Sequence, residues 1–427
     1  MTLTLLVAGF LLLSSLGMPV AYAIGVTSVL LLLVDGLVPL VVAPQRMFVV
    51  VNSFALMAIP FFLLAGEFMN TGGITRRLVN LSDALVGHIR GGLAHVVVVA
   101  EMFLSGISGS SAADASAVGG MLIPAMVQKG YNKNFSVAIN CAASTLGPII
   151  PPSIIMIIYG SLTGVSIGAL FLGGVVPGVL IGGGMMAASY LLSRQGRYVA
   201  EPRPPASWGE TRAAFREASL ALLLPLVILG GIITGIFTAT EAGAVAAVLS
   251  LILGVFVYKE LSPRDIFPVV LRAASGTAVV MLLCATAAIF GWILAKERFG
   301  DLALAGMQAV TTSPLGIMLL VGVLLLIVGC FVDTVASTII LIPVLHPVMV
   351  KLGFDPIHFG VIAVILITLG GLTPPVAPLL YIASTIAKSP ALEALPLVLL
   401  FMAIILAVTG VLILYPPLVT YLPSLFF

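Results

Sequence analysis

Glycines and small hydroxyl residues gather at four places inside long apolar stretches, and they are the residues best suited to chemistry. Two of these places are tips between apolar arms, and two are breaks where glycine and proline interrupt an apolar run. Backbone freed from a helix at membrane depth is tolerated only where it lines a cavity or is buried in protein. Its carbonyl oxygens and nearby hydroxyls suit a hard cation such as Na⁺, and helix N-termini suit an anion.

Both halves of the chain supply candidate ligands for these roles. The expected Na⁺ ligands are Gly106 and Ser108 at the first tip, Ser144, Gly147 and Pro148 at the first break, Gly329 and Cys330 at the second tip, and Thr368, Gly370 and Thr373 at the second break. The expected substrate ligands are Ser110, Ser111, Asp114, Thr145, Asp333, Thr334 and Ser337. Symmetry between the halves predicts two or more Na⁺ sites.

The acids in these stretches have a functional and a structural interpretation. An intramembrane acid is a functional candidate by default, but Ser111 and Asp114 also have the spacing of a helix-capping box. We expect Asp333 to matter more for function than Asp114. Glu67 and Glu101 are expected near the ends of their elements, where packing or interface contacts explain them.

Composition excludes a soluble fold. The 427 residues are 61% hydrophobic and 8% charged, where a soluble domain carries roughly 25% charged residues. The continuous apolar runs indicate an all-α polytopic protein of the lipid bilayer, not a barrel of short alternating strands. A net charge of +2 with no basic cluster predicts no nucleic-acid partner, and the cysteines lack metal-binding spacing.

The chain contains an internal repeat. Thr145-Leu146-Gly147 with Pro151-Pro152 returns 223 positions later as Thr368-Leu369-Gly370 with Pro374-Pro375. We predict a first repeat over 1–195, a linker over 196–216 and a second repeat over 217–427. The predicted hairpins are 91–127 and 315–350, and the predicted broken helices are 134–163 and 357–387. The arms of the first hairpin, about 14 residues each, are too short to cross a core that needs roughly 20.

The remaining apolar runs complete each repeat. An opening pair is interrupted at Gly17, a span covers Phe48 to Met69, and Ile74 to Arg90 is expected to lie in the interface. In the second half, Ser262 to Ala274 is expected to be interfacial and Thr277 to Ala295 to be a span.

Each repeat thus has five transmembrane helices and one re-entrant hairpin, and the odd number of crossings inverts the second repeat. With the linker in the cytoplasm, 14 of the 18 basic residues lie inside, as the positive-inside rule requires.

Two enzyme interpretations are weaker. Gly106-Ile107-Ser108-Gly109 matches the Gly-x-Ser-Gly of intramembrane serine proteases, but no later helix presents a histidine base for the serine. Asp114 and Asp333 could imitate an aspartyl dyad, but neither follows a Gly-x-Gly. We therefore expect no catalytic residues and no enzyme.

Longer motifs carry a family resemblance over essentially the whole chain. They are Gly106 to Asp114, Met121 to Pro124, Gly130-Tyr131, Thr145 to Ser153, Asp333 and Thr373-Pro374-Pro375. With them the chain resembles the large membrane subunit of tripartite ATP-independent periplasmic (TRAP) transporters. The resemblance implies Na⁺-driven uptake of organic acids across the bacterial inner membrane by an elevator, in which a transport domain slides against a scaffold. It also implies a periplasmic substrate-binding protein and a separate small four-helix membrane subunit as partners.

The resulting hypothesis is Na⁺-coupled uptake of a small carboxylate held between the two hairpin tips. No arginine is visible near either tip, so Na⁺, hydroxyls and helix N-termini must meet the carboxylate. A stand-alone ion-coupled anion transporter is the main alternative, and a channel is the third.

Overall fold

The computed structural model describes residues 2–36, 38–196, 198 and 204–427, and these residues form helices without any strand. Arg197 and Arg203, which entered the count of basic residues, lie outside the described part of the chain, as do four more of the 21 residues of the predicted linker.

The first half contains ten α-helices and a short 3₁₀ turn within the described residues. They are α1 (Thr2–Ser15), α2 (Val20–Asp35), α3 (Val42–Val51), η1 (Ala55–Met57), α4 (Ala58–Thr71), α5 (Ile74–Val86), α6 (Gly92–Ser108), α7 (Ser111–Gln128), α8 (Lys133–Ser144), α9 (Ile154–Thr163) and α10 (Ile167–Arg194).

The second half repeats this order. Its helices are α11 (Trp208–Ile233), α12 (Ala239–Ile252) with the π-helical extension η2 (Leu253–Val257), α13 (Pro263–Lys296), α14 (Phe299–Val310), α15 (Pro314–Phe331), α16 (Thr334–Lys351), α17 (Pro356–Gly370), α18 (Pro378–Ala387), α19 (Ala391–Leu414) and α20 (Pro417–Ser424).

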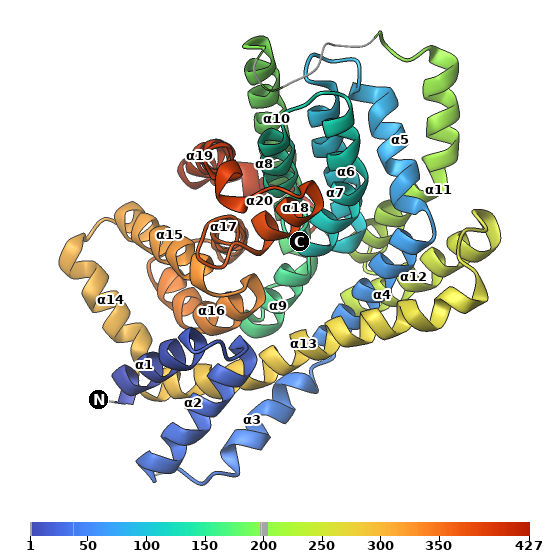
Figure 1. Ribbon diagram of the computed structural model, residues 1–427. Helices are drawn as coiled ribbons and strands as arrows, with labels where there is room; N and C mark the ends of the chain where they lie inside the picture. Colours follow the sequence, from blue (N-terminus) through green and yellow to red (C-terminus); the bar gives the residue numbers. More distant parts are fainter. Residues whose placement is uncertain (1, 37, 197, 199–203) are drawn as a thin grey trace.

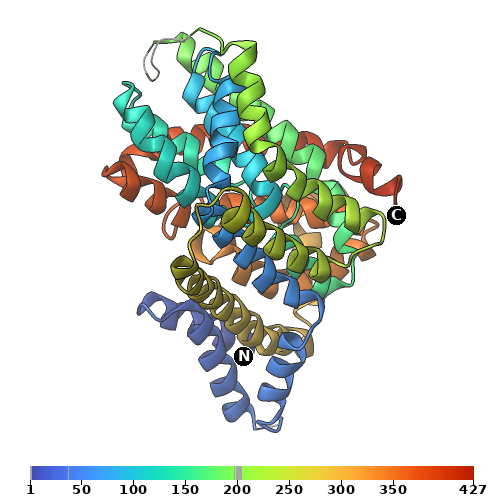
Figure 2. The ribbon, with the colours of Figure 1, turned by 90° about the vertical axis from the view of Figure 1, so that its right-hand side faces the viewer.

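The helices form two packed groups that meet along α13. Helices α2, α3 and α4 pack on α13, and α12 packs on α4; Figure 2 shows α1 to α3 on the side of α13 away from most of the molecule. The hairpins α6–α7 and α15–α16 and the broken helices α8–α9 and α17–α18 pack on one another in the centre (Figure 1). The two groups touch where α13 packs on α16 and where α4 packs on α6.

The pairs α6–α7 and α15–α16 occupy the segments predicted as hairpins, and α8–α9 and α17–α18 occupy those predicted as broken helices. The arms of the first pair are longer than predicted. Helix α6 has 17 residues and α7 has 18, because α6 continues through Ser105 and ends only at Gly109, whose φ of 64° leaves the helical region. Both breaks contain a cis Pro–Pro peptide bond, at Pro151–Pro152 and at Pro374–Pro375.

In each half, one predicted element differs from the structure. The interfacial stretch and the span predicted from Ser262 to Ala295 form one 34-residue helix, α13, in which Gly276 is accommodated without a break. The single span predicted from Phe48 to Met69 is instead bent by 60° between α3 and α4. The second half therefore has one continuous helix, α13, where the first half has the bent pair α3–α4.

The predicted linker is also shorter than expected. Helix α11 begins at Trp208, inside the predicted 196–216 segment, because Ser207 and Glu210 form a capping box there. Among the described residues, seven helices are long and apolar enough to cross a membrane, or eight if the bent α3–α4 pair forms one span. An all-helical, multi-pass membrane fold is confirmed.

Candidate substrate and ion site

Both hairpin tips and both breaks meet at a cavity of about 130 Å³. The first half lines it with Gly109, Ser110, Ser111, Ala112, Pro148, Ile154 and Ile155, and the second half with Asp333, Thr334, Val335, Gly371, Pro378 and Leu379. Two residues of the other helix group, Leu63 of α4 and Val280 of α13, complete the wall. The cavity therefore lies between the hairpin group and the helices packed on α13.

Four helices begin at this cavity. The first residues of α7, α9, α16 and α18, which are Ser111, Ile154, Thr334 and Pro378, all line it. Amide N–H groups in the first turn of a helix have no partner within the helix, and the N-terminal end carries a partial positive charge. Four such ends around one small space direct partial positive charge toward it without a basic side chain.

The first tip packs directly on the first break. A Cβ atom added to Gly109 would lie 2.6 Å from the carbonyl oxygen of Pro152, and one added to Gly147 would lie 2.6 Å from Asp114 Oδ2 and 3.0 Å from the Ser111 nitrogen. Only glycine permits backbone approach this close. The two glycines thus allow backbone from α6–α7 and from the break to converge.

The second tip and break repeat this contact with different residues. A Cβ atom on Gly370 would lie 2.5 Å from the Gly329 Cα atom. The Val376 N–H donates to the Cys330 carbonyl at 3.2 Å, and the Cys330 sulfur lies 2.7 Å from Thr373 Oγ1. Each half therefore holds its tip against its own break.

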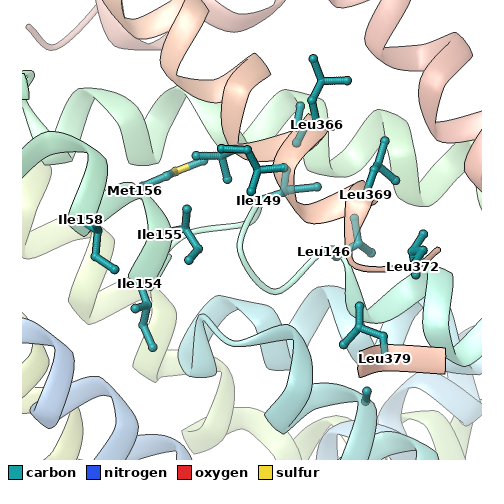
Figure 3. Packing of buried hydrophobic residues seen from close by; sticks show 14 of the residues in the cluster. Leu146, Ile149, Ile154, Ile155, Met156, Ile158, Leu366, Leu369, Leu372 and Leu379 are labelled. Atoms are coloured by element: carbon teal, nitrogen blue, oxygen red, sulfur yellow. The ribbon is translucent and has the colours of Figure 1, made fainter. Parts of the chain in front are cut away.

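An apolar core fixes the breaks behind the cavity. Figure 3 shows Leu146 and Ile149 of the first break close to Leu366, Leu369 and Leu372 of the second, and all five belong to one buried cluster. Buried leucine and isoleucine side chains in dense contact resist displacement. The irregular backbone is thus supported on one side and open to the cavity on the other.

The predicted substrate residues fall into two sets. Ser110, Ser111, Asp333 and Thr334 line the cavity. Asp114, Thr145 and Ser337 are buried behind it and are not part of its wall. The Thr145 hydroxyl donates to the Ala142 carbonyl at 2.6 Å, and that of Ser337 donates to the Val332 carbonyl at 3.2 Å.

Five of the ten predicted Na⁺ ligands lie at the two contacts between tip and break. Gly147, Gly329, Cys330, Gly370 and Thr373 make the contacts described above, and Pro148 lines the cavity. Gly106 packs against Pro225 of α11, and the Ser144 and Thr368 hydroxyls donate to carbonyls of their own helices. A hydroxyl that donates its hydrogen keeps oxygen lone pairs for a cation. An oxygen-rich, glycine-lined set fits a hard monovalent cation.

The aspartates differ in environment. Asp333 caps α16, because its Oδ1 accepts from the Val335 N–H at 2.9 Å. Asp114 is completely buried and accepts a hydrogen bond from the Ser108 hydroxyl. The capping box proposed for Ser111 and Asp114 is absent, since Ser110 is the cap of α7 and accepts from the Ala113 N–H.

The two glutamates expected near element ends also differ. Glu67 forms a partly exposed ion pair with Arg272 at 2.8 Å, as an interface contact would. The expectation for Glu101 is wrong: it lies in the middle of α6 and is completely buried, because α6 packs on α7, α8 and α10.

Residues that sequence reasoning missed make the apolar part of the cavity wall. Ile154 and Pro378 could have been found from their position directly after the breaks. Leu63 and Val280 carry no such signal, since their place depends on the packing of helices distant in sequence.

The surroundings of Ser108 do not suit a serine nucleophile. Its hydroxyl donates to buried Asp114, and three of the described histidines make hydrogen bonds elsewhere: His95 contacts the Arg90 carbonyl, His346 contacts Tyr159 and His358 contacts the Leu412 carbonyl. Across the described ranges there is also no group of three His, Cys, Asp or Glu residues placed to hold a metal ion.

The chain matches a known protein family over nearly its whole length. Residues 7–418 match the family described as "Tripartite ATP-independent periplasmic transporter, DctM component". The chain belongs to this family. It is therefore a membrane transporter subunit of the TRAP type, and not an enzyme.

Curated relatives agree with this assignment. The chain is 41% identical over 92% of its length to the isethionate TRAP transporter permease protein DctMQ of Oleidesulfovibrio alaskensis, of which it spans 63%. It is 37% identical to the sialic acid TRAP transporter large permease protein SiaM of Vibrio cholerae, over 96% of both chains. It is 40% identical to the C4-dicarboxylate TRAP transporter large permease protein DctM of Pseudomonas aeruginosa, over 85% of this chain and 86% of that one.

A solved structure shares the fold. The YdaH transporter of Alcanivorax borkumensis superposes with a TM-score of 0.62 over 85% of this chain and 84% of that chain, at 17% sequence identity. At this identity the likeness concerns architecture alone.

Proposed function

We propose that this TRAP permease subunit couples the uptake of a small organic acid across the bacterial inner membrane to a Na⁺ gradient. The observation that carries the proposal is the convergence of four helix N-termini on one cavity, which Ser111 and Thr334 line from the two halves. Such an arrangement recognises an anionic head group by N–H donors and hydroxyls. The relatives named above, which are permeases for isethionate, sialic acid and C4-dicarboxylates, support an acidic substrate.

The lining favours a small substrate with one strongly recognised acidic group. Among the described residues no lysine, arginine or histidine lines the cavity, and the Asp333 carboxylate in its wall disfavours a second negative charge nearby. A volume of about 130 Å³ is close to that of an engineered cavity of roughly 150 Å³ that holds benzene. The apolar wall from Ile155, Leu379 and Val280 suits the carbon skeleton.

Na⁺ is expected where each tip meets its break. There it would balance the charge of the acid and bring carbonyl and hydroxyl oxygens into order, so that binding of the acid and of Na⁺ assist each other. Two thermodynamically linked ligands raise each other's affinity by the same factor. This is the physical basis of the proposed symport.

Movement between the two sides of the membrane is proposed to follow the division of the helices. The hairpins and broken helices would slide as one transport domain against the scaffold around α13. Leu63 and Val280 line the cavity with apolar side chains that form no hydrogen bond or ion pair with the tips, which is compatible with sliding. A periplasmic binding protein would deliver the acid, and a small four-helix membrane subunit would complete the scaffold.

Reconstitution tests the proposal. The chain is placed in proteoliposomes with a small four-helix subunit of the TRAP type, and uptake of radiolabelled short-chain acids is measured with and without a periplasmic binding protein. We expect saturable uptake that requires an inward Na⁺ gradient and the binding protein. Uptake without the binding protein would favour the stand-alone transporter, and uptake that persists when choline replaces Na⁺ would refute Na⁺ coupling.

A further inference from the structure

Glu101 is a buried acid that the proposed substrate and ion contacts do not use. It lies in the middle of α6 with 0% of its surface exposed, and neither carboxylate oxygen has a hydrogen-bond donor among the described residues. Glutamate is almost never buried to this degree without a partner. An ionised carboxylate in such a place requires compensation.

A second buried acid stands beside it. Glu101 is close enough to Asp114 of α7 to interact with it electrostatically. The Oδ1 atom of Asp114 accepts from Ser108, but Oδ2 has no donor among the described residues and lies against Gly147. One helical turn after Glu101, the buried Ser105 hydroxyl is also without a partner in the described part of the chain.

No positive charge among the described residues pairs with these acids. The ion pairs of the described residues involve other carboxylates, namely Glu260, Glu67, Asp35 and Asp301. Helix α8 packs on α6, and its Cys141 thiol interacts electrostatically with Glu101. This thiol is neutral when protonated. If these carboxylates are ionised, the compensating charge comes from outside the chain; otherwise they are protonated.

We propose that Glu101 and Asp114, with the Ser105 hydroxyl, hold a Na⁺ ion behind the first hairpin, in addition to the ions at the contacts between tips and breaks. Carboxylate and hydroxyl oxygens are ligands that hard cations prefer. The inference rests on the proposed Na⁺ coupling and adds a deeper, anionic site to it. Because Asp114 also touches Gly147 and Ser108, the ion would tie hairpin and broken helix together.

The second half does not repeat this site. At the 219-position shift that relates Asp114 to Asp333, Glu101 corresponds to Leu320 and Ser105 to Leu324, both on α15. Leucine offers no oxygen, and Asp333 is engaged in capping α16. The first half should therefore bind one ion more than the second.

Direct Na⁺ binding tests the proposal without relying on transport. The purified chain in nanodiscs is equilibrated with ²²Na⁺ at constant ionic strength maintained with choline, without any acid, and the number of ions bound per chain is measured. Glu101→Gln keeps the shape of the side chain and removes its charge. Glu67→Gln is the matched control, because it removes a partly exposed glutamate that is already paired with Arg272.

We expect Glu101→Gln to bind one ion fewer than the wild type and Glu67→Gln to bind the same number. Ser105→Ala should raise the Kd of that ion by roughly threefold to tenfold, the effect of losing one oxygen ligand, and it tests the site even if Glu101→Gln is poorly folded. Equal numbers in wild type and Glu101→Gln would overturn the inference and leave Glu101 a protonated packing residue. A wild type that binds no Na⁺ would overturn the coupling proposal itself.

Discussion

Gly370 approaches Gly329 so closely that a Cβ atom on Gly370 would lie 2.5 Å from the Gly329 Cα atom. The neighbour is backbone, so no flexible side chain can move aside to relieve the clash. The second hairpin tip can therefore contact the second break only because Gly329 of the tip and Gly370 of the break both lack side chains.

Substitution of Gly370 should separate this tip from its break. We expect Gly370→Ala to destabilise the contact by about 1–3 kcal/mol through overpacking and to reduce Na⁺-dependent uptake strongly, while membrane insertion stays normal. Uptake in proteoliposomes and the amount of protein in the membrane fraction check this.

Gly291→Ala is the matched control, because a Cβ atom at Gly291 of α13 meets nothing within 4 Å. If Gly370→Ala transports normally and keeps its Na⁺ dependence, the contact between tip and break is not part of the ion site.

The aspartates should respond differently to replacement by asparagine. Asparagine is as good a helix cap as aspartate, so Asp333→Asn should keep the cap of α16 and much of its activity. Asp114→Asn loses a buried charge beside Glu101 and should weaken Na⁺ binding by about 1–3 kcal/mol. The geometry therefore favours Asp114 where sequence alone favoured Asp333; a Na⁺ titration of uptake for both variants decides the order.

The hydroxyl of Thr373 is expected to support the second ion site. Thr373→Val removes the oxygen that lies 2.7 Å from the Cys330 sulfur and nearly preserves the shape of the side chain. It should raise the Na⁺ concentration for half-maximal uptake by roughly threefold to tenfold, equivalent to about one hydrogen bond. Thr373→Ser keeps the hydroxyl and should behave like the wild type. Identical Na⁺ dependence in all three proteins would remove Thr373 from the site.

Two neighbouring valines of α13 offer a test of the cavity wall. Val280 lines the cavity, and Val279 is 60% exposed on the outer side of the helix. Val280→Trp should fill the cavity and abolish binding of the acid, and Val280→Ala should admit bulkier acids. The same changes at Val279 should have little effect on acid binding, measured by competition with a labelled acid. Equal effects at both positions would argue against this cavity as the substrate site.

Local sequence signals were enough to locate the breaks and the tips. Pro151-Pro152 and Pro374-Pro375 cannot continue a helix, and Gly109 with a φ of 64° ends α6. The repeat of these motifs also predicted that two similar contacts between tip and break exist.

Other features depend on packing that a single sequence does not encode locally. Ser275 and Gly276 look like a boundary, but they lie within α13, where helix propensity is a weak guide. The hydroxyls of Thr145 and Ser337 were expected to face a substrate, but they donate to backbone carbonyls of their own segments. Leu63 and Val280 reach the cavity only because α4 and α13 pack beside it.

The position of the bound acid tests the central claim most directly. An electron cryo-microscopy map of the chain in nanodiscs, with its small subunit, Na⁺ and a transported acid, locates that acid. We predict acid density in the cavity, with its charged group within hydrogen-bonding distance of the first turns of α7 and α16 at Ser111 and Thr334. Density for the acid elsewhere, with this cavity filled by side chains, would contradict the account.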